Sequence, residues 1–444
     1  MQTLAQIQKR FQDGETSRSL VETCLARIAE PSGEGSRAFL QVSAAAARTT
    51  SDNYDRLRRG GGTLAGIPVS IKDLFDVAGE ITTAGSIALR DAAPAPADAP
   101  CVARLRAAGF IPIGRTNMTE FAFSGLGINP HYDTPRNIYD RNNERIPGGS
   151  SSGAAVSITD GMAFVALGTD TGGSCRIPAA LCGTVGFKPT ARRVPLEGVF
   201  PLSPSLDSVG SLAASVACCA AVDAVIAGEA PASLPTLSVA GLRLAVPQTY
   251  VLDDIDDNVA HAFDAALSKL SAAGAEITLI PLRELAELPH INAKGGFPAA
   301  EALAFHRDLI AAKRTSYDPR VLSRILRGNE QNEADYHALK HARANLIERV
   351  RNVTAAYDAV VMPTVPIIAP LISEVATDAS YGRLNLLLLR NPTVANFLDR
   401  CAISIPCHRP GDAPVGLGLM GEHGADRRLL AVAQAVETIV SNTG

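Results

Sequence analysis

Two serines, Ser150 and Ser174, each follow a pair of glycines within one segment, Ile146 to Pro189, which reads IPGGSSSGAAVSITDGMAFVALGTDTGGSCRIPAALCGTVGFKP. Glycine has no Cβ and accepts positive φ angles, so Gly-Gly-Ser loops free backbone N–H groups to face a ligand. A serine hydroxyl in such a loop can attack a carbonyl carbon while the N–H groups hold the resulting oxyanion. From the spacing alone, either loop could hold such a nucleophile or bind a phosphate.

A serine nucleophile needs a base, and the eight histidines are scattered along the chain. A lysine kept neutral by burial can replace histidine, and Lys72 is the candidate because it ends an otherwise apolar segment. Residues 149–153 also match the nucleophile elbow Gly-x-Ser-x-Gly, with Ser151 at its centre. We interpret this match as coincidental. A nucleophile elbow follows a strand, whereas the preceding residues 140–147 are polar and loop-like.

The elements that position these residues follow an α/β pattern. Apolar and other residues alternate over 66–73, which predicts a strand that ends in Lys72. Residues 98–108 predict a helix and 110–114 the next strand, and residues 154–168 predict a helix and a strand that bring the two serine loops together. This alternation favours a parallel or mixed sheet.

The rest of the chain adds further expected elements. We expect strands at 242–247 and 358–366, a buried helix within 212–227, a mainly helical stretch at 299–356 and a C-terminal helix at 427–439. Ser19 and Glu22 have the spacing of a capping box at the start of a helix. A helical insertion between strands can form the wall of a substrate pocket.

The longer motifs resemble those of the amidase signature family. They are Gly66-Ile-Pro-Val-Ser-Ile-Lys-Asp73, Gly114-Arg-Thr-Asn-Met-Thr-Glu-Phe-Ala122, Pro147-Gly-Gly-Ser-Ser-Ser-Gly153, Gly168-Thr-Asp-Thr-Gly-Gly-Ser-Cys-Arg-Ile-Pro178, Phe187-Lys-Pro189 and Pro363-Thr-Val-Pro366. The motifs stand in a fixed order along the sequence, and the resemblance covers most of the chain. The resemblance implies one amidase signature domain over residues 1–444, in which helices cover both faces of a large mixed β-sheet, and a helical pocket segment at about 292–356.

The resemblance also assigns roles to residues. It implies a catalytic triad of Lys72 as base, Ser150 as a bridging serine after a cis peptide bond, and Ser174 as nucleophile. The remaining roles concern the oxyanion hole, the residues around the triad and the substrate. The oxyanion hole takes the backbone N–H groups of Thr171, Gly172, Gly173 and Ser174. Ser151 is expected to bond Lys72, and Asp170 and Arg176 to brace the loop. Phe123, Ser124 and Gly125 are expected to contact substrate.

Two residues depart from the family's usual pattern. Cys175 follows the nucleophile where a branched aliphatic residue is more common, and Ser152 stands where many members have glycine. Both side chains are small enough for the loop. Cys175 lacks an evident histidine partner, which argues against a cysteine nucleophile.

Composition limits the other possible roles. The formal charge is −4, so no basic excess favours nucleic acid, and no apolar run is long enough to indicate a membrane span. No secretory signal is evident, and eight cysteines without a Cys-x-x-Cys pair suit reduced thiols, so we expect a cytoplasmic protein.

His337 and His341 have the spacing of two ligands on one helix face but lack a third ligand, and we expect neither a metal nor a cofactor. A homodimer is favoured on general grounds.

The sequence thus predicts an amidohydrolase that cleaves a small carboxamide, or a related carbamate or urea-like bond, through an acyl-enzyme on Ser174. Two alternatives stay open. One is the glutaminase-type A subunit of a tRNA-dependent amidotransferase, and the other is a catalytically inactive scaffold with the same fold.

Overall fold

The computed structural model describes residues 1–57 and 64–441. Eleven strands in these residues form one sheet. They are β1 (Phe39–Val42), β2 (Pro68–Lys72), β3 (Ile111–Thr116), β4 (Val165–Thr169), β5 (Val185–Lys188), β6 (Val209–Ala213), β7 (Arg243–Pro247), β8 (Glu276–Ile280), β9 (Ala359–Pro363), β10 (Ala402–Pro406) and β11 (Gly416–Met420).

The order across the sheet is β1-β3-β2-β4-β6-β5-β10-β11-β9-β7-β8. β2 runs parallel to both β3 and β4, and β7 runs parallel to both β8 and β9, whereas the other neighbours are antiparallel. The sheet is therefore mixed, and helices cover both of its faces, so the predicted α/β fold class is confirmed.

Fifteen α-helices accompany the sheet in the described part of the chain. They are α1 (Leu4–Gln12), α2 (Ser17–Ala29), α3 (Gly35–Ala38), α4 (Ala44–Leu57), α5 (Pro100–Ala107), α6 (Ser152–Thr159), α7 (Arg176–Cys182), α8 (Val216–Ala227), α9 (Asp257–Ala272), α10 (Leu288–Ile291), α11 (Gly296–Lys313), α12 (Pro319–Leu326), α13 (Glu333–Thr354), α14 (Asp378–Phe397) and α15 (Asp426–Val440).

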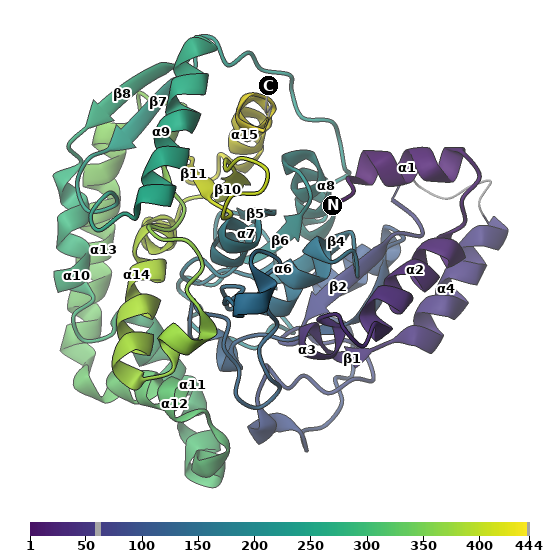
Figure 1. Ribbon diagram of the computed structural model, residues 1–444. Helices are drawn as coiled ribbons and strands as arrows, with labels where there is room; N and C mark the ends of the chain where they lie inside the picture. Colours follow the sequence, from purple (N-terminus) through teal and green to yellow (C-terminus); the bar gives the residue numbers. More distant parts are fainter. Residues whose placement is uncertain (58–63, 442–444) are drawn as a thin grey trace.

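The helices differ in where they lie along the sheet. α1, α2 and α4 gather at one end of the molecule, and α10 to α13 at the other (Figure 1). α6 and α7 pack against each other near the middle, and α14 packs against α7. α15 packs against α8 and α9. No helix among the described residues is long and apolar enough to cross a membrane.

The topology explains how the reactive segments meet. β2 and β4 are parallel neighbours, so their carboxyl ends lie at the same edge of the sheet, and Lys72 ends one strand while Thr169 ends the other. The first serine loop leads into α6, which returns the chain to β4, and the second loop leads from β4 into α7. The predicted helix and strand between the two loops are confirmed.

Most other expected elements also form, within a few residues of the predicted bounds. The capping box predicted at Ser19 is wrong, because α2 begins at Ser17 and its N-cap is Thr16, whose side chain accepts a hydrogen bond from the Ser19 backbone N–H. α14 had no counterpart in the prediction. It contains Pro392 and has buried residues on several sides, which obscures the helical period.

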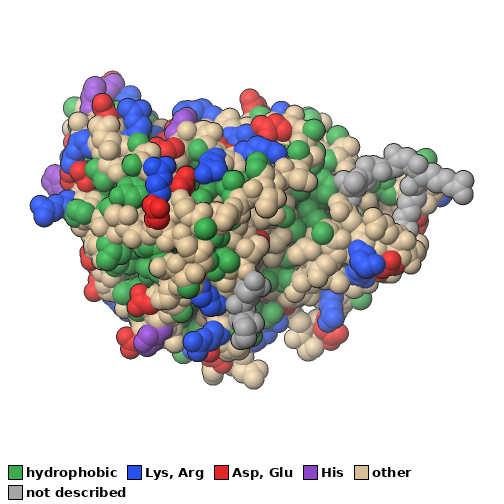
Figure 2. All heavy atoms as spheres, turned by 90° about the horizontal axis from the view of Figure 1, so that it is seen from above, with side chains coloured by type: hydrophobic (Ala, Val, Ile, Leu, Met, Phe, Trp, Pro, Cys, Tyr) green, Lys and Arg blue, Asp and Glu red, His purple; other side chains and the backbone are tan. Residues whose placement is uncertain are grey.

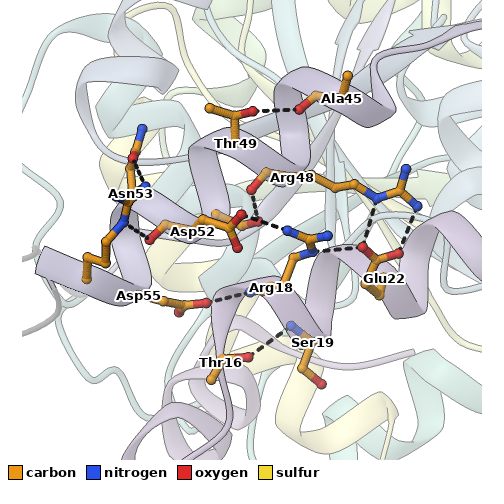
Figure 3. Close-up of polar contacts among 12 residues, drawn as sticks. Thr16, Arg18, Ser19, Glu22, Ala45, Arg48, Thr49, Asp52, Asn53 and Asp55 are labelled. Carbon is orange, nitrogen blue, oxygen red and sulfur yellow. Dashed lines mark hydrogen bonds and ion pairs between the residues drawn. The ribbon is translucent and has the colours of Figure 1, made fainter.

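Ion pairs join α2 to α4 at the surface (Figure 3). Glu22 accepts hydrogen bonds from Arg18 of its own helix and from Arg48 of α4, at 2.7 to 2.9 Å. Arg18 also reaches Asp52 of α4 at 2.7 Å. These contacts lie at the surface between α2 and α4, next to the end of the sheet that carries β1.

Candidate active site

Lys72 lies at the end of β2 and is fully buried. Its Nζ donates hydrogen bonds to Ser150 Oγ at 2.8 Å and to Thr169 Oγ1 at 2.9 Å. Burial lowers the pKa of Lys72 from 10.5 to about 8, and the charges of Asp170 and Asp207 partly oppose this shift. A lysine with this pKa is partly neutral near physiological pH, as a general base requires.

Ser150 is held in place from both sides. The peptide bond between Gly149 and Ser150 is cis. The Gly149 N–H donates to the Gly125 carbonyl at 2.8 Å, and the Ser150 carbonyl accepts from the Thr119 N–H at 3.1 Å. A Cβ at position 149 would stand 2.6 Å from the Gly127 backbone nitrogen, so only glycine fits there.

The second serine loop lies directly against the first. Ser174 stands between β4 and α7, and its carbonyl accepts the Ser151 N–H at 3.3 Å. Ser150 and Ser174 are both buried, at 0% and 3% exposed. The structure thus brings Lys72, Ser150 and the Ser174 loop together, with Ser174 nearly closed off from bulk water.

A buried ion pair encloses the Ser174 loop. Arg176 donates to both carboxylate oxygens of Asp170 at 2.9 and 3.0 Å, and Asn396 of α14 bonds both partners. Burial alone would raise the pKa of Asp170, but the charge and hydrogen bonds of Arg176, together with Lys188, outweigh it and lower that pKa to about 2. The pair is therefore ionised, and its position matches the expected bracing role.

The four expected oxyanion donors are not equivalent. The Gly173 N–H already donates to Asp170 Oδ1 at 2.8 Å, so the expectation that it is free for an oxyanion needs correction. Within the described residues, no hydrogen bond engages the backbone N–H of Thr171, Gly172 or Ser174. Asp170 does not engage these three, because its carboxylate accepts the N–H groups of Gly173 and Cys175.

The residues beside the triad differ from the expectation in one contact. Ser151 Oγ donates to the carbonyl of Thr169 at 3.4 Å, and it is the Thr169 hydroxyl that accepts from Lys72. Thr169 was missed because nothing in its local sequence distinguishes it from any strand threonine. Cys175 is buried, and burial raises the pKa of its thiol, which keeps it protonated and unreactive.

The expected substrate segment lies beside the first serine loop and under α14. Ser124 Oγ and the Gly125 N–H both donate to Asn385 Oδ1, at 2.9 and 2.8 Å. A Cβ at Gly125 would stand 3.3 Å from Leu389, a side chain that also lies 3.4 Å from such a position at Gly172. α14 thus spans both loops, a wall that the sequence did not predict.

Other candidates lie away from this site. His337 and His341 are both exposed on α13. No group of three or more histidine, cysteine, aspartate or glutamate side chains in the described part of the chain could hold a metal ion. All eight cysteines are free and buried, as expected for small apolar side chains.

The chain belongs to the amidase family, whose profile matches residues 19–430. It is 37% identical over 438 residues to 2-amino-5-chloromuconic acid deaminase of Comamonas testosteroni, covering 96% of this chain and 93% of that protein. It is 34% identical to mandelamide hydrolase of Pseudomonas putida, covering 96% and 88%. It is 33% identical to the A subunit of glutamyl-tRNA(Gln) amidotransferase from Symbiobacterium thermophilum, covering 100% and 97%.

A solved amidase crystal structure superposes on the whole molecule. The TM-score is 0.88 at 31% sequence identity, with 99% of this chain and 100% of that chain covered. The fold and the family agree with the resemblance seen in the motifs. The protein is therefore an amidase that acts on carbon–nitrogen bonds.

Proposed function

We propose that this amidase hydrolyses a small carboxamide, or a related carbamate or urea-like bond, through an acyl-enzyme on Ser174. The contact that carries the proposal is the 2.8 Å hydrogen bond from the buried Lys72 Nζ to Ser150 Oγ. A lysine with a pKa of about 8 can take a proton from a serine that lies beside a second serine.

In the proposed relay, neutral Lys72 accepts the hydroxyl proton of Ser150 as Ser150 accepts that of Ser174. Ser174 Oγ then bonds to the amide carbon, and the carbonyl electron pair moves onto oxygen. The free N–H groups of Thr171, Gly172 and Ser174 would hold this oxyanion, and one such donor is worth about 2.7 to 4 kcal/mol in comparable enzymes.

Collapse of the tetrahedral species breaks the C–N bond, Ser150 gives its proton to the departing nitrogen, and Lys72 returns a proton to Ser150 and becomes neutral again. Ammonia or an amine leaves, and the acyl group stays on Ser174. Water then attacks the ester, and its proton passes through Ser150 to Lys72. When the second tetrahedral species collapses, the ester C–O bond breaks and that proton returns through Ser150 to Ser174 Oγ, which releases the carboxylic acid and free Ser174 with Lys72 neutral again. Every proton in both halves of the reaction moves between Lys72, the two serines and substrate or water.

The likeness to the A subunit of an amidotransferase supports one alternative, in which the protein supplies ammonia from glutamine to its partners. Turnover by the purified chain separates the two functions. We expect the lone protein to release ammonia from simple carboxamides without glutamine or tRNA, and Ser174→Ala to abolish the release. Activity that appears only with glutamine and added partner proteins would support the alternative, and a folded but inert protein would support a scaffold.

The small-molecule role also agrees with the surface. On the face shown in Figure 2, lysine and arginine side chains are interspersed with aspartate and glutamate, so this face carries no basic stripe of the kind that binds nucleic acid. The free cysteines favour a reducing compartment, and we propose a cytoplasmic enzyme. A homodimer is proposed on the general frequency of such assemblies.

A further inference from the structure

Three buried polar atoms without a hydrogen-bond partner belong to residues packed around the Phe123–Ser124 segment. They are Arg324 Nε of α12 and, from α14, Tyr381 Oη and Asn385 Nδ2. An unpaired buried donor costs about 1 to 3 kcal/mol, and more when it is charged. Three of them in one place indicate a site that a ligand completes.

The orientation of Asn385 is fixed by its partners. Its Oδ1 accepts from the Gly125 backbone N–H, which can only donate, and also from Ser124 Oγ. Turning the amide over would set its Nδ2 group against the Gly125 N–H, donor against donor, so the Nδ2 group must point the other way, where no acceptor meets it.

Arg324 has no counter-ion. Its guanidinium lies 4.8 Å from the centre of the Phe123 ring, and within the described residues no hydrogen bond or ion pair engages it. Burial lowers the pKa of Arg324, and only the Tyr381 hydroxyl opposes this. By contrast, the buried Arg115 and Arg176 each pair with an aspartate, at 2.7 and 2.9 Å.

Tyr381 completes the donor set. Burial raises its pKa, which the neighbouring Ser124 hydroxyl and Arg324 only partly oppose, so the phenol stays protonated and can donate. Arg320 covers its ring at 4.7 Å but directs its own donors to Asp378 and to backbone carbonyls. The charge of Asp318 also raises the pKa of Tyr381. The same carboxylate caps α12 by accepting a hydrogen bond from the Arg320 backbone N–H. Asp318 and Asp378 are thus engaged with Arg320, and the charge of Arg324 is available to a ligand.

The site lies next to the reaction centre. Ser124 precedes Gly125, which bonds the Gly149 N–H in the first serine loop, and Leu389 bridges from Gly125 to Gly172 in the second. Phe123, which Arg324 contacts, lies two residues before Gly125, and two residues along a chain span at most about 7 Å. A group bound at Arg324 is therefore within reach of the same small molecule whose amide meets Ser174.

We propose that Arg324, Tyr381 and Asn385 form a carboxylate-binding subsite, so that the substrate is an amide whose acyl part also carries a carboxylate. A carboxylate offers two oxygens with four acceptor positions, which suits a guanidinium, a phenol and an amide N–H group. The inference rests on the proposed hydrolysis of carboxamides. Because a primary carboxamide loses only ammonia, the carboxylate must belong to the acyl part.

The test compares matched substrates on the intact protein. Succinamate, glutaramate and adipamate are half-amides, and butanamide, pentanamide and hexanamide are their neutral partners of equal carbon number. We expect kcat/KM for the best half-amide to exceed that of its neutral partner by about 10- to 150-fold, because a hydrogen bond to a charged group contributes about 1.5 to 3 kcal/mol. Succinate, glutarate or adipate should inhibit competitively.

Variants test whether the preference for half-amides comes from Arg324. Arg324→Met should reduce the ratio of half-amide to neutral-amide kcat/KM at least tenfold, mainly through KM, and Arg324→Lys should restore part of it. Arg383→Met is the matched control, because it removes the same charge from an exposed position on α14 and should leave the ratio as in the wild type.

Each outcome separates this proposal from the hydrolysis on which it rests. Equal turnover of charged and neutral amides, without inhibition by dicarboxylates, would overturn the subsite while leaving amide hydrolysis intact. The dicarboxylate inhibition uses the wild-type protein, so it decides the question even where Arg324→Met does not fold. If no amide of either kind is hydrolysed, the proposed function itself fails.

Discussion

At the residue scale, the chemistry depends on how one lysine is solvated. Lys72 is surrounded by protein, and among the described residues only two hydroxyl groups, those of Ser150 and Thr169, accept its hydrogen bonds. Two neutral acceptors stabilise an ammonium far less than water does, so burial dominates the pKa. The same side chain on the surface would be charged and useless as a base.

The pH dependence of activity tests this directly. In the proposed relay the neutral form of Lys72 is the active one, and the Lys72 pKa is about 8, so kcat/KM should rise tenfold per pH unit below pH 8 and level off above it. Lys72→Ala should lose most of the turnover while the protein stays folded. An acid side without slope, or a Lys72→Ala enzyme with a near-normal rate at neutral pH, would contradict the relay.

Thr169 should raise the pKa of Lys72. Its hydroxyl accepts from Lys72 Nζ, and a bond from the charged ammonium is stronger than one from the neutral amine. Thr169→Val therefore destabilises the charged form, so the acid limb of kcat/KM should move to lower pH. Ser151→Ala is the control, because Ser151 contacts the Thr169 carbonyl instead, and its limb should stay in place. A shift of the Thr169→Val limb to higher pH would show that the contact favours the neutral lysine.

At the element scale, α14 closes the site over two loops that belong to distant parts of the chain. Its Asn385 holds Gly125, and its Asn396 holds the pair of Asp170 and Arg176. The helix thus couples the first wall of the substrate pocket to the oxyanion loop.

Removing the Asn396 amide should affect both stability and rate. Asn396→Leu leaves Asp170 and Arg176 with fewer partners, and we expect the free energy of unfolding to fall by about 1 to 3 kcal/mol and kcat to fall more than KM changes. Asn391→Leu is the matched control. It also removes two buried hydrogen bonds from α14, to the Val251 and Pro363 carbonyls, so it should cost similar stability in urea unfolding with a smaller loss of kcat. Equal losses of kcat would show that Asn396 acts only on packing.

The ion pairs between α2 and α4 should matter little (Figure 3). Hydrogen bonds from Arg48 and Arg18 lower the pKa of Glu22 from 4.5 to about 2, so the contribution of Glu22 is present above pH 4.5 and is lost as the pH falls towards 2. Its side chain is 41% exposed, and solvent screens the pairs. Glu22→Gln should lower the free energy of unfolding by less than about 1 kcal/mol at pH 7 and by nothing at pH 2, as urea titrations can measure. A larger loss at pH 7 would indicate that the two helices dock mainly through this network.

At the scale of the whole molecule, the sequence predicted what is local and missed what is assembled from distant segments. Lys72, Ser150 and Ser174 lie in continuous motifs, so their types and order were enough to place them. Arg324 and Phe123 meet only because α12 packs beside the Ser124 segment, and no local pattern records that contact. α14 was missed for a similar reason, since a helix buried on several sides has no clear apolar face.

The burial of Lys72 also depends on segments that are distant in the sequence. A strand with helices on both faces hides every side chain, so the alternation that predicted a strand gave no measure of how deeply the lysine lies. Only the assembled sheet, in which β2 is an inner strand between β3 and β4, buries Lys72 and so suits it to the proposed role of base.

The most direct test of the account is the site of covalent modification. The wild-type protein treated with a fluorophosphonate should gain one adduct, and peptide mass spectrometry should place it on Ser174. Ser174→Ala should gain none, and Lys72→Ala should react far more slowly. An adduct on Ser151 or Cys175, or labelling of Ser174 at an equal rate without Lys72, would contradict the assignment of Ser174 as a nucleophile activated through Ser150 and Lys72.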